Sequence, residues 1–287
     1  KSKDFTHTLL QYNISITSST LSSNVLLLTE FRSRRPISSE TSQLRKRYYS
    51  SLISSKFVVT AAHCSSASER DTTLMDVVPK IVRLGSRNIL DGSNYGVSPV
   101  DVDIIKIIVH PKYKSPKLYY DIALMELGRP QIFSFNIQPA CLWTKHDFGM
   151  YSRKANVTGW GVTQAGTISE IDIIDSTTCG NLLRSSCNRN WCGVQEYQLC
   201  AGKLSGGVDA CQGDSGGPLT VKIPLPITTQ GNMNYILGVT SFGVGCALPD
   251  LPGIYTRISS FIDWIEPILV PYFGLVICKP SRFKITF

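Results

Sequence analysis

The segment from Asp209 to Pro218, Asp-Ala-Cys-Gln-Gly-Asp-Ser-Gly-Gly-Pro, combines residue types that suit nucleophilic catalysis. Glycines on both sides of Ser215 let the backbone turn so that the N–H groups of Gly213 and Ser215 converge on one point, where they would form an oxyanion hole. A serine hydroxyl is a weak nucleophile at neutral pH and needs an adjacent base that a third group orients. The segment therefore predicts a nucleophilic serine and requires a base elsewhere in the chain.

Two further segments offer the base and the orienting group. Thr60-Ala-Ala-His-Cys64 places His63 directly after a predicted strand, and Asp121-Ile-Ala-Leu places a carboxylate at the head of an apolar strand. Each segment alone carries little weight, because such a histidine is usually a core residue and such an aspartate is usually a strand-end cap. A buried carboxylate is costly unless it is hydrogen-bonded or paired. Together with Ser215, the two residues predict a Ser-His-Asp arrangement.

Short β-branched or apolar runs, separated by Gly, Pro, Asn and Asp clusters, must position these residues. Such runs are typical of antiparallel strands joined by turns. One helix is expected near the C-terminus, with Ser260 as N-cap, and Pro267 should end or kink it. Residues 1–47 are rich in Ser and Thr and poorly periodic. The pattern predicts an all-β barrel or sandwich class. The expected strands are 56–60, 80–84, 103–109, 122–127, 156–160, 235–239 and 253–257.

Composition excludes several other classes of protein. The 287 residues are 43% hydrophobic and 17% charged, with a formal net charge of +8, which excludes a wholly disordered chain. No apolar run approaches the roughly 18 residues of a spanning helix, so no membrane partner is expected. The basic residues between 32 and 47 lie among Ser and Thr rather than among stacking aromatics. They predict a solvated linker, and no nucleic-acid partner.

The nine cysteines favour an oxidising compartment and hence secretion. No CxxC pair occurs, and the histidines are not spaced as zinc ligands, so neither a metal site nor another cofactor is expected. Cys187 and Cys192 are close enough in sequence to pair locally. An odd number of cysteines leaves at least one thiol without a partner in this chain.

The chain order His, Asp, Ser resembles that of the chymotrypsin-like serine proteases, from about Tyr48 to Ile265. The resemblance rests on Thr-Ala-Ala-His-Cys, Asp-Ile-Ala-Leu, Gly-Asp-Ser-Gly-Gly-Pro, and the segments 157–161, 241–243 and 252–256. It implies two six-stranded antiparallel β-barrels with a C-terminal helix and the active site in the cleft between the barrels. It also implies a protease domain over residues 25–268, with 1–24 unassigned and 269–287 a tail. Segments 110–113, 138–142, 198–202 and 238–243 resemble the snake-like branch of the arthropod clip-domain proteases most closely.

The resemblance assigns a role to each candidate residue. His63 is the general base and then acid, Asp121 fixes its tautomer, and Ser215 forms the acyl-enzyme, with the oxyanion held by Gly213 and Ser215. Asp209 lies at the floor of the specificity pocket and favours a cationic P1 side chain. Ala210 removes a hydroxyl that would suit lysine, which favours arginine. The remaining pocket residues are Ser241, Phe242, Gly243 and Gly253.

The same resemblance assigns the other cysteines. Cys179 would pair with Cys200, and Cys211 with Cys246. In the family, the cysteine after the catalytic histidine pairs with one in a segment that here reads Tyr48-Tyr-Ser-Ser-Leu-Ile53, so the partner of Cys64 is absent. Cys141 occupies the position that tethers an N-terminal regulatory part in clip-domain proteases. Cys278 has no family counterpart.

Two main functions follow as hypotheses. The first is a secreted trypsin-like endopeptidase that cleaves after Arg, and less well after Lys, in an extracellular cascade of innate immunity or development, under control of serpin-type inhibitors. The second is a non-catalytic or permanently zymogen-like homologue that acts as a binding or regulatory module. It arises because residues 1–47 contain no Ile/Val-Val-Gly-Gly sequence, whose new terminus would pair with Asp214. An aberrant or incomplete product is a third reading of the same departures.

Overall fold

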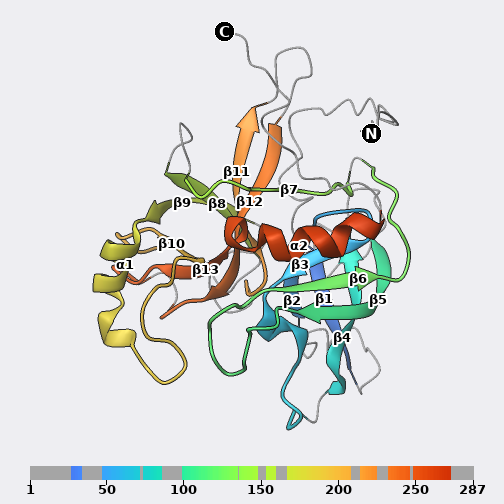
Figure 1. Ribbon diagram of the computed structural model, residues 1–287, viewed down its shortest axis with the longest axis horizontal. Coiled ribbons are helices and arrows are strands. Elements are labelled where there is room, and N and C mark those ends of the chain that lie inside the picture. The colour runs from blue at the N-terminus through green and yellow to red at the C-terminus, as the bar shows by residue number, and fades with distance from the viewer. Residues whose placement is uncertain are drawn as a thin grey trace, which may run out of the picture.

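The computed structural model describes residues 27–33, 47–71, 74–85, 99–134, 136–147, 153–159, 167–207, 214–224, 232–245 and 248–272. Within these residues, thirteen strands form two sheets that lie side by side (Figure 1). Two α-helices and several 3-10 turns complete the fold. None of the helices in this described part of the chain is long and apolar enough to cross a membrane.

The first sheet is a closed barrel in the strand order β1-β2-β3-β6-β5-β4. Its strands β3 and β6 are buried at every position, because both of their faces are covered. On β3, Val58 packs into the barrel interior, whereas Phe57 and Val59 pack into a second core outside it. Because successive side chains of a strand point to opposite faces, β3 contributes residues to both cores. The strand bounds are β1 (Leu27–Ser33), β2 (Arg47–Leu52), β3 (Phe57–Thr60), β4 (Leu74–Leu84), β5 (Val100–Val109) and β6 (Ala123–Leu127).

The second sheet has the order β11-β8-β9-β10-β13-β12-β7, and a further pairing of β11 with β12 closes six of these strands into a ring. These six pair antiparallel, whereas β7 lies parallel to β12, with Cys141 opposite Tyr235. The interior of the ring holds apolar residues from every strand of the ring, among them Val157, Ile171 and Leu219. The strand bounds are β7 (Cys141–Leu142), β8 (Lys154–Gly159), β9 (Thr167–Ile174), β10 (Gln198–Gly202), β11 (Pro218–Pro224), β12 (Asn232–Phe242) and β13 (Gly253–Arg257).

The helices are short. α1 (Ser176–Leu182) begins after Asp175, whose carboxylate accepts the Thr178 N–H at 2.9 Å and caps the first turn. α2 (Ile262–Leu269) follows a 3-10 turn at Ile258–Phe261, and Figure 1 shows it crossing in front of the junction of the two sheets. Its buried residues join the core that both sheets share. The other 3-10 turns are Ala62–Ser65, Arg184–Ser186 and Val270–Tyr272.

The predicted all-β fold with two barrels and a C-terminal helix is confirmed, although six of the strands, β1, β2, β7, β9, β10 and β11, were not among those expected. The parallel strand β7 extends the second sheet beyond six strands. Strand β1 lies within the first 47 residues, where the sequence showed no periodicity, and pairs with both β2 and β4. Helix α2 continues past Pro267 to Leu269, and its N-cap is Phe261 rather than the expected Ser260, with no side-chain cap hydrogen bond.

Candidate active site

His63 lies in the 3-10 turn Ala62–Ser65, directly after β3, and faces Asp121 at the head of β6. The backbone N–H of His63 donates to Asp121 Oδ1 at 2.9 Å, and Nδ1 lies 2.8 Å from Oδ2. One carboxylate thus fixes both the turn and the imidazole ring. Because an ionised carboxylate can only accept, Nδ1 carries a hydrogen and the neutral ring presents its lone pair at Nε2.

The Asp121 carboxylate is buried, with 1% of the residue exposed. Besides His63, the Ser241 hydroxyl donates to Oδ2, and the Thr256 hydroxyl donates to the Asp121 carbonyl at 2.8 Å. Burial alone would raise the pKa of Asp121, but the interaction with His63 and the hydrogen bonds from His63 and Ser241 outweigh it and lower the pKa. The group therefore stays ionised inside the protein, and residues of both sheets hold it in place.

The Nε2 side of the ring has a neighbour that the sequence did not assign to it. Cys64 is the free cysteine of the described residues; it is buried, and its Sγ lies 3.5 Å from His63 Nε2. Burial raises the pKa of the Cys64 thiol, although His63 opposes the shift. Burial tends to lower the pKa of His63, but Cys64 and Asp121 outweigh it and hold that pKa well above its usual range.

The nucleophile segment is fixed to both sheets by backbone hydrogen bonds. The Ser215 carbonyl accepts the Tyr49 N–H of β2 at 2.9 Å, and the Gly216 N–H donates to the Thr240 carbonyl of β12 at 2.9 Å. Ser215 itself is half-buried. No hydrogen bond joins Ser215 to His63 within the described residues. The backbone of the Ser215 loop is thus anchored to both sheets, while His63 Nε2 engages the Cys64 sulfur.

The other predicted site residues are distributed as follows. Ser241, expected in the specificity pocket, is buried and bonds to Asp121. The Phe242 ring meets the Trp191 ring edge to face at 5.4 Å between centroids, Gly243 is exposed, and Gly253 is buried at the start of β13. Asp214 is buried. Asp209, Ala210 and Gly213 lie outside the described residues, as do Cys211, Cys246 and Cys278.

Two disulfides have both of their cysteines among the described residues. Cys179 is joined to Cys200 in the interior, and Cys187 is joined to Cys192 on the surface. Cys141 is also disulfide-bonded. Its expected role as the attachment point of a regulatory segment stays a prediction.

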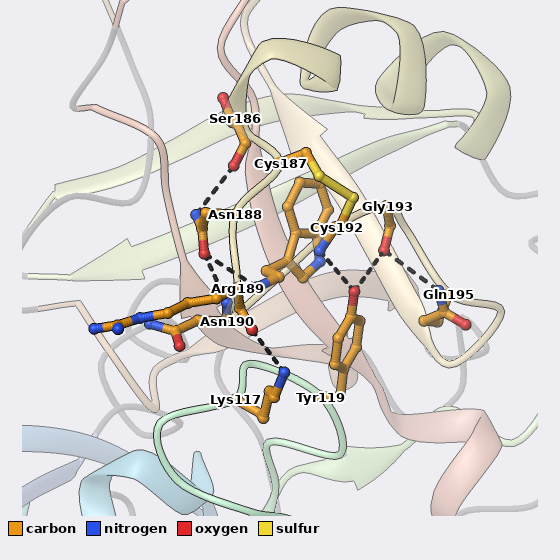
Figure 2. The surroundings of a disulfide bond; sticks show 11 residues. Lys117, Tyr119, Ser186, Cys187, Asn188, Arg189, Asn190, Cys192, Gly193 and Gln195 are labelled. Atoms are coloured by element: carbon orange, nitrogen blue, oxygen red, sulfur yellow. Dashed lines mark hydrogen bonds between the residues drawn. A yellow bond between two sulfur atoms is a disulfide. The ribbon is translucent and has the colours of Figure 1, made fainter.

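Figure 2 shows how the surface disulfide loop holds the segment that leads into Asp121. The Lys117 ammonium donates to the Arg189 carbonyl at 2.6 Å, and the Tyr119 hydroxyl accepts the Cys192 N–H at 2.8 Å. In addition, Gln198 Nε2 donates to the Leu118 carbonyl at 3.0 Å. The segment before the catalytic candidate Asp121 is thereby tied to the second sheet.

The arrangement of His63 and Asp121 suits proton transfer. No group of three or more His, Cys, Asp or Glu side chains gathers as metal ligands would in the described part of the chain. A buried, ionised aspartate behind a histidine, with a serine loop anchored alongside, provides the groups that acyl transfer needs.

Comparison with known proteins identifies the family of this chain. The Trypsin family matches residues 38–265. Serine protease snk of Drosophila melanogaster is 39% identical over 76% of this chain and 48% of its own length; clotting factor G beta subunit of Tachypleus tridentatus is 37% identical over 76% and 69%. Serine protease Hayan of Drosophila melanogaster is 39% identical over 77% of this chain and 34% of its own length. The chain belongs to the trypsin family of serine endopeptidases, and it spans less than half of two of these relatives.

Two contacts escaped the sequence reasoning. The bond from Ser241 to Asp121 joins segments far apart in the chain, and no local pattern signals it. The contact of Cys64 with His63 had a partial signal, because the missing cysteine partner already left that thiol unpaired.

Proposed function

We propose that this chain is a secreted endopeptidase that cleaves protein substrates after arginine, and less well after lysine. The observation that supports it most is the buried, ionised Asp121 that holds His63 through two hydrogen bonds beside the anchored Ser215 loop. In the proposed reaction, the Ser215 hydroxyl attacks the peptide carbonyl and its proton passes to His63 Nε2. Asp121 stabilises the imidazolium that forms.

The proposed second half of the reaction returns the enzyme to its starting state. His63 gives its proton to the leaving amine, and the acyl group stays on Ser215 as an ester. A water molecule, activated by the now neutral imidazole, then hydrolyses that ester. The N–H groups of Gly213 and Ser215 would stabilise the negative charge on the substrate oxygen in both steps.

The preference for arginine rests on the sequence around the nucleophile. Asp209, six residues before Ser215, supplies the carboxylate for a cationic side chain, and Ala210 beside it offers no hydroxyl to a lysine ammonium. Arginine can engage a carboxylate through two parallel hydrogen bonds, whereas lysine acts as a point charge. Matched arginyl and lysyl substrates should therefore differ in kcat/KM, and equal values would contradict the preference.

Its setting in an extracellular cascade is proposed from the names of the relatives, one of which is a clotting factor subunit. The disulfides support secretion, because such bonds persist in oxidising compartments. Protein substrates with Arg or Lys at P1 and serpin-type inhibitors are the partners that this role implies.

The second candidate is a homologue with little or no catalytic activity. The engagement of His63 Nε2 by Cys64, in place of Ser215, favours it. The lack of an Ile/Val-Val-Gly-Gly sequence in residues 1–47 points the same way.

Active-site titration distinguishes the two candidates. We expect a stoichiometric burst of product when the protein meets an arginyl ester, since acylation of Ser215 releases one leaving group per site. The Ser215→Ala variant is the blank and should give no burst. Well-folded protein that gives no burst at any pH between 6 and 10 would favour the homologue without catalysis.

A further inference from the structure

We propose that Cys64 restrains the reactive centre, because its sulfur holds a hydrogen on the Nε2 side of His63 and so competes with Ser215 for the base. This inference rests on the proposed role of His63 as general base. It makes Cys64 a positioning residue that acts through His63 and does not touch the substrate.

The geometry leaves the sulfur little freedom to turn away. Cys64 is fully buried in the 3-10 turn that carries His63, and its backbone N–H donates to the Ala61 carbonyl at 3.0 Å. A Cβ placed on Gly216 would lie 3.3 Å from Cys64 Sγ, so the sulfur lies against the backbone of the residue that follows Ser215. The thiol thus sits between the histidine and the nucleophile loop.

The chemistry of the pair explains the competition. Nδ1 already donates to Asp121, so Nε2 offers the one lone pair of the neutral ring. Thr60 is a second hydrogen-bond partner of the thiol. In the contact between the sulfur and the ring, either the thiol donates its hydrogen to Nε2, or Nε2 carries the hydrogen and donates it to the sulfur. In both cases the lone pair is engaged, and the proton of the Ser215 hydroxyl has no acceptor. The hydrogen shared by Sγ and Nε2 must leave before Ser215 can attack.

The two tyrosines near the ring do not ionise in the pH range of interest, unlike the pair of Cys64 and His63. The Tyr48 ring meets the imidazole edge to face at 6.0 Å between centroids, and burial raises the pKa of Tyr48 far above its usual value. Burial and the charge of Asp121 raise the pKa of Tyr113 to about 12. Both phenols stay neutral between pH 5 and pH 10. The pair of Cys64 and His63, with Asp121 behind it, therefore governs ionisation at the base over that range.

The sign of the pH effect follows from this arrangement. His63 acts as a base only after the shared hydrogen is lost, and the pKa of His63 lies well above its usual range. Activity should accordingly rise at a higher pH than an isolated histidine would allow. Removal of the sulfur takes away one of the two groups that raise this pKa. The rise of kcat/KM on the acid side of its pH profile, the acid limb, should therefore move to lower pH.

The test compares wild type with Cys64→Ala, using kcat/KM for an arginyl ester from pH 5 to pH 10. We expect the acid limb to move down by about one pH unit, with kcat/KM at pH 6 rising about tenfold, since the neutral fraction changes tenfold for each unit below the pKa. KM should stay the same, because the sulfur does not touch the substrate. Cys64→Ser, which keeps the volume of the site and a hydroxyl but cannot form a thiolate, should also lower the limb.

A matched control and a readout without catalysis complete the experiment. Ser259→Ala also removes one heavy atom from a 3-10 turn, where the Ser259 hydroxyl is buried without a partner among the described residues, and should leave the limb in place. The pKa of His63 is then followed by nitrogen-15 NMR in the Ser215→Ala background, with and without Cys64→Ala. A fall in that pKa supports the restraint even if no variant is active.

The outcomes separate this inference from the proposed function. Burst activity with the same acid limb and the same His63 pKa in wild type and Cys64→Ala would overturn the restraint and leave the peptidase assignment intact. A fall in the His63 pKa without a burst in any folded variant would uphold the contact and overturn the assignment.

Discussion

At the scale of single residues, Gly216 is required by the space around it as well as by its backbone angle. Its φ is +80°, a conformation that favours glycine. A Cβ at this position would lie 2.2 Å from the Tyr49 carbonyl oxygen and 2.3 Å from Thr60 Oγ1. These two atoms are themselves joined by a 2.6 Å hydrogen bond. The glycine therefore permits β2 and β3 to approach the nucleophile loop.

Replacement of Gly216 by alanine should destabilise the protein strongly. Strain at positive φ costs about 1–2 kcal/mol and overpacking about 1–3 kcal/mol, so we expect a loss of roughly 3 kcal/mol or more in the free energy of unfolding, measured by urea denaturation.

Substitutions at two other glycines separate the cost of backbone strain from the cost of overpacking. Gly207 has a φ of +89° and open space around it, so Gly207→Ala should cost only the strain of about 1–2 kcal/mol. Gly180, in α1 with open space, should tolerate alanine or gain up to about 1 kcal/mol. Equal losses at Gly216 and Gly207 would show that the close contacts do not matter.

The sequence predicted part of this picture. Glycines beside Ser215 indicated a tight turn of the nucleophile loop. The close approach of Tyr49 and Thr60 could not be predicted, because it depends on how β2 and β3 meet a loop from the other sheet.

At the scale of elements, the two disulfides whose cysteines all lie among the described residues constrain different parts of the fold. The bond between Cys179 and Cys200 links α1 to β10 in the interior, over a sequence separation of 21. The bond between Cys187 and Cys192 closes a surface loop over a separation of 5. The surface loop in turn holds Lys117 and Tyr119 (Figure 2).

Removal of each disulfide by paired Cys→Ala substitutions should have unequal effects. The entropy of closing the longer loop predicts a loss of about 3 kcal/mol for the Cys179–Cys200 pair and about 2 kcal/mol for the Cys187–Cys192 pair. Urea denaturation of the two double variants measures the difference. Removal of the Cys187–Cys192 pair should additionally speed amide exchange in residues 117–120, because the surface loop holds this segment. A larger global loss for the surface pair would contradict the loop-closure argument.

The elements also show where local sequence patterns fail. Strands β3 and β6 were predicted because each is a short, mainly β-branched or apolar run between turn residues. Strand β1 was missed, because its pairing with β2 and β4 is a property of the closed barrel and not of its own composition. Helix α2 passes through Pro267 because both Pro267 and Asp263, whose carbonyl loses its N–H partner, are exposed to water.

At the scale of the whole molecule, one apolar core joins the two sheets and α2. It contains Phe57 and Leu124 of the first barrel, Ile236 of the second sheet, and Ile265 and Leu269 of the helix. Because residues of both halves are buried against one another, the two barrels should unfold as one cooperative unit. The resemblance predicted both barrels, but not which side chains fill the junction between them.

Truncation of Ile265, which is fully buried, should weaken both halves together. Ile265→Ala should cost about 2–5 kcal/mol in the free energy of unfolding, whereas the same substitution at Ile132, which is 89% exposed, should change it by less than about 0.5 kcal/mol. Amide exchange of β10 reports the second half, and amide exchange of β3 reports the first. Transitions that separate in the two probes would contradict cooperative unfolding.

The buried thiol of Cys64 also makes the opening of the reactive centre measurable by chemical labelling. A thiol reagent reaches that sulfur only when the His63 turn separates from the Gly216 backbone. When reclosing is faster than labelling, the labelling rate equals that of an exposed thiol multiplied by the equilibrium constant for opening. Any ligand that holds the two segments together must slow this labelling, so chemical labelling of one atom measures the fraction of time that the two segments spend apart.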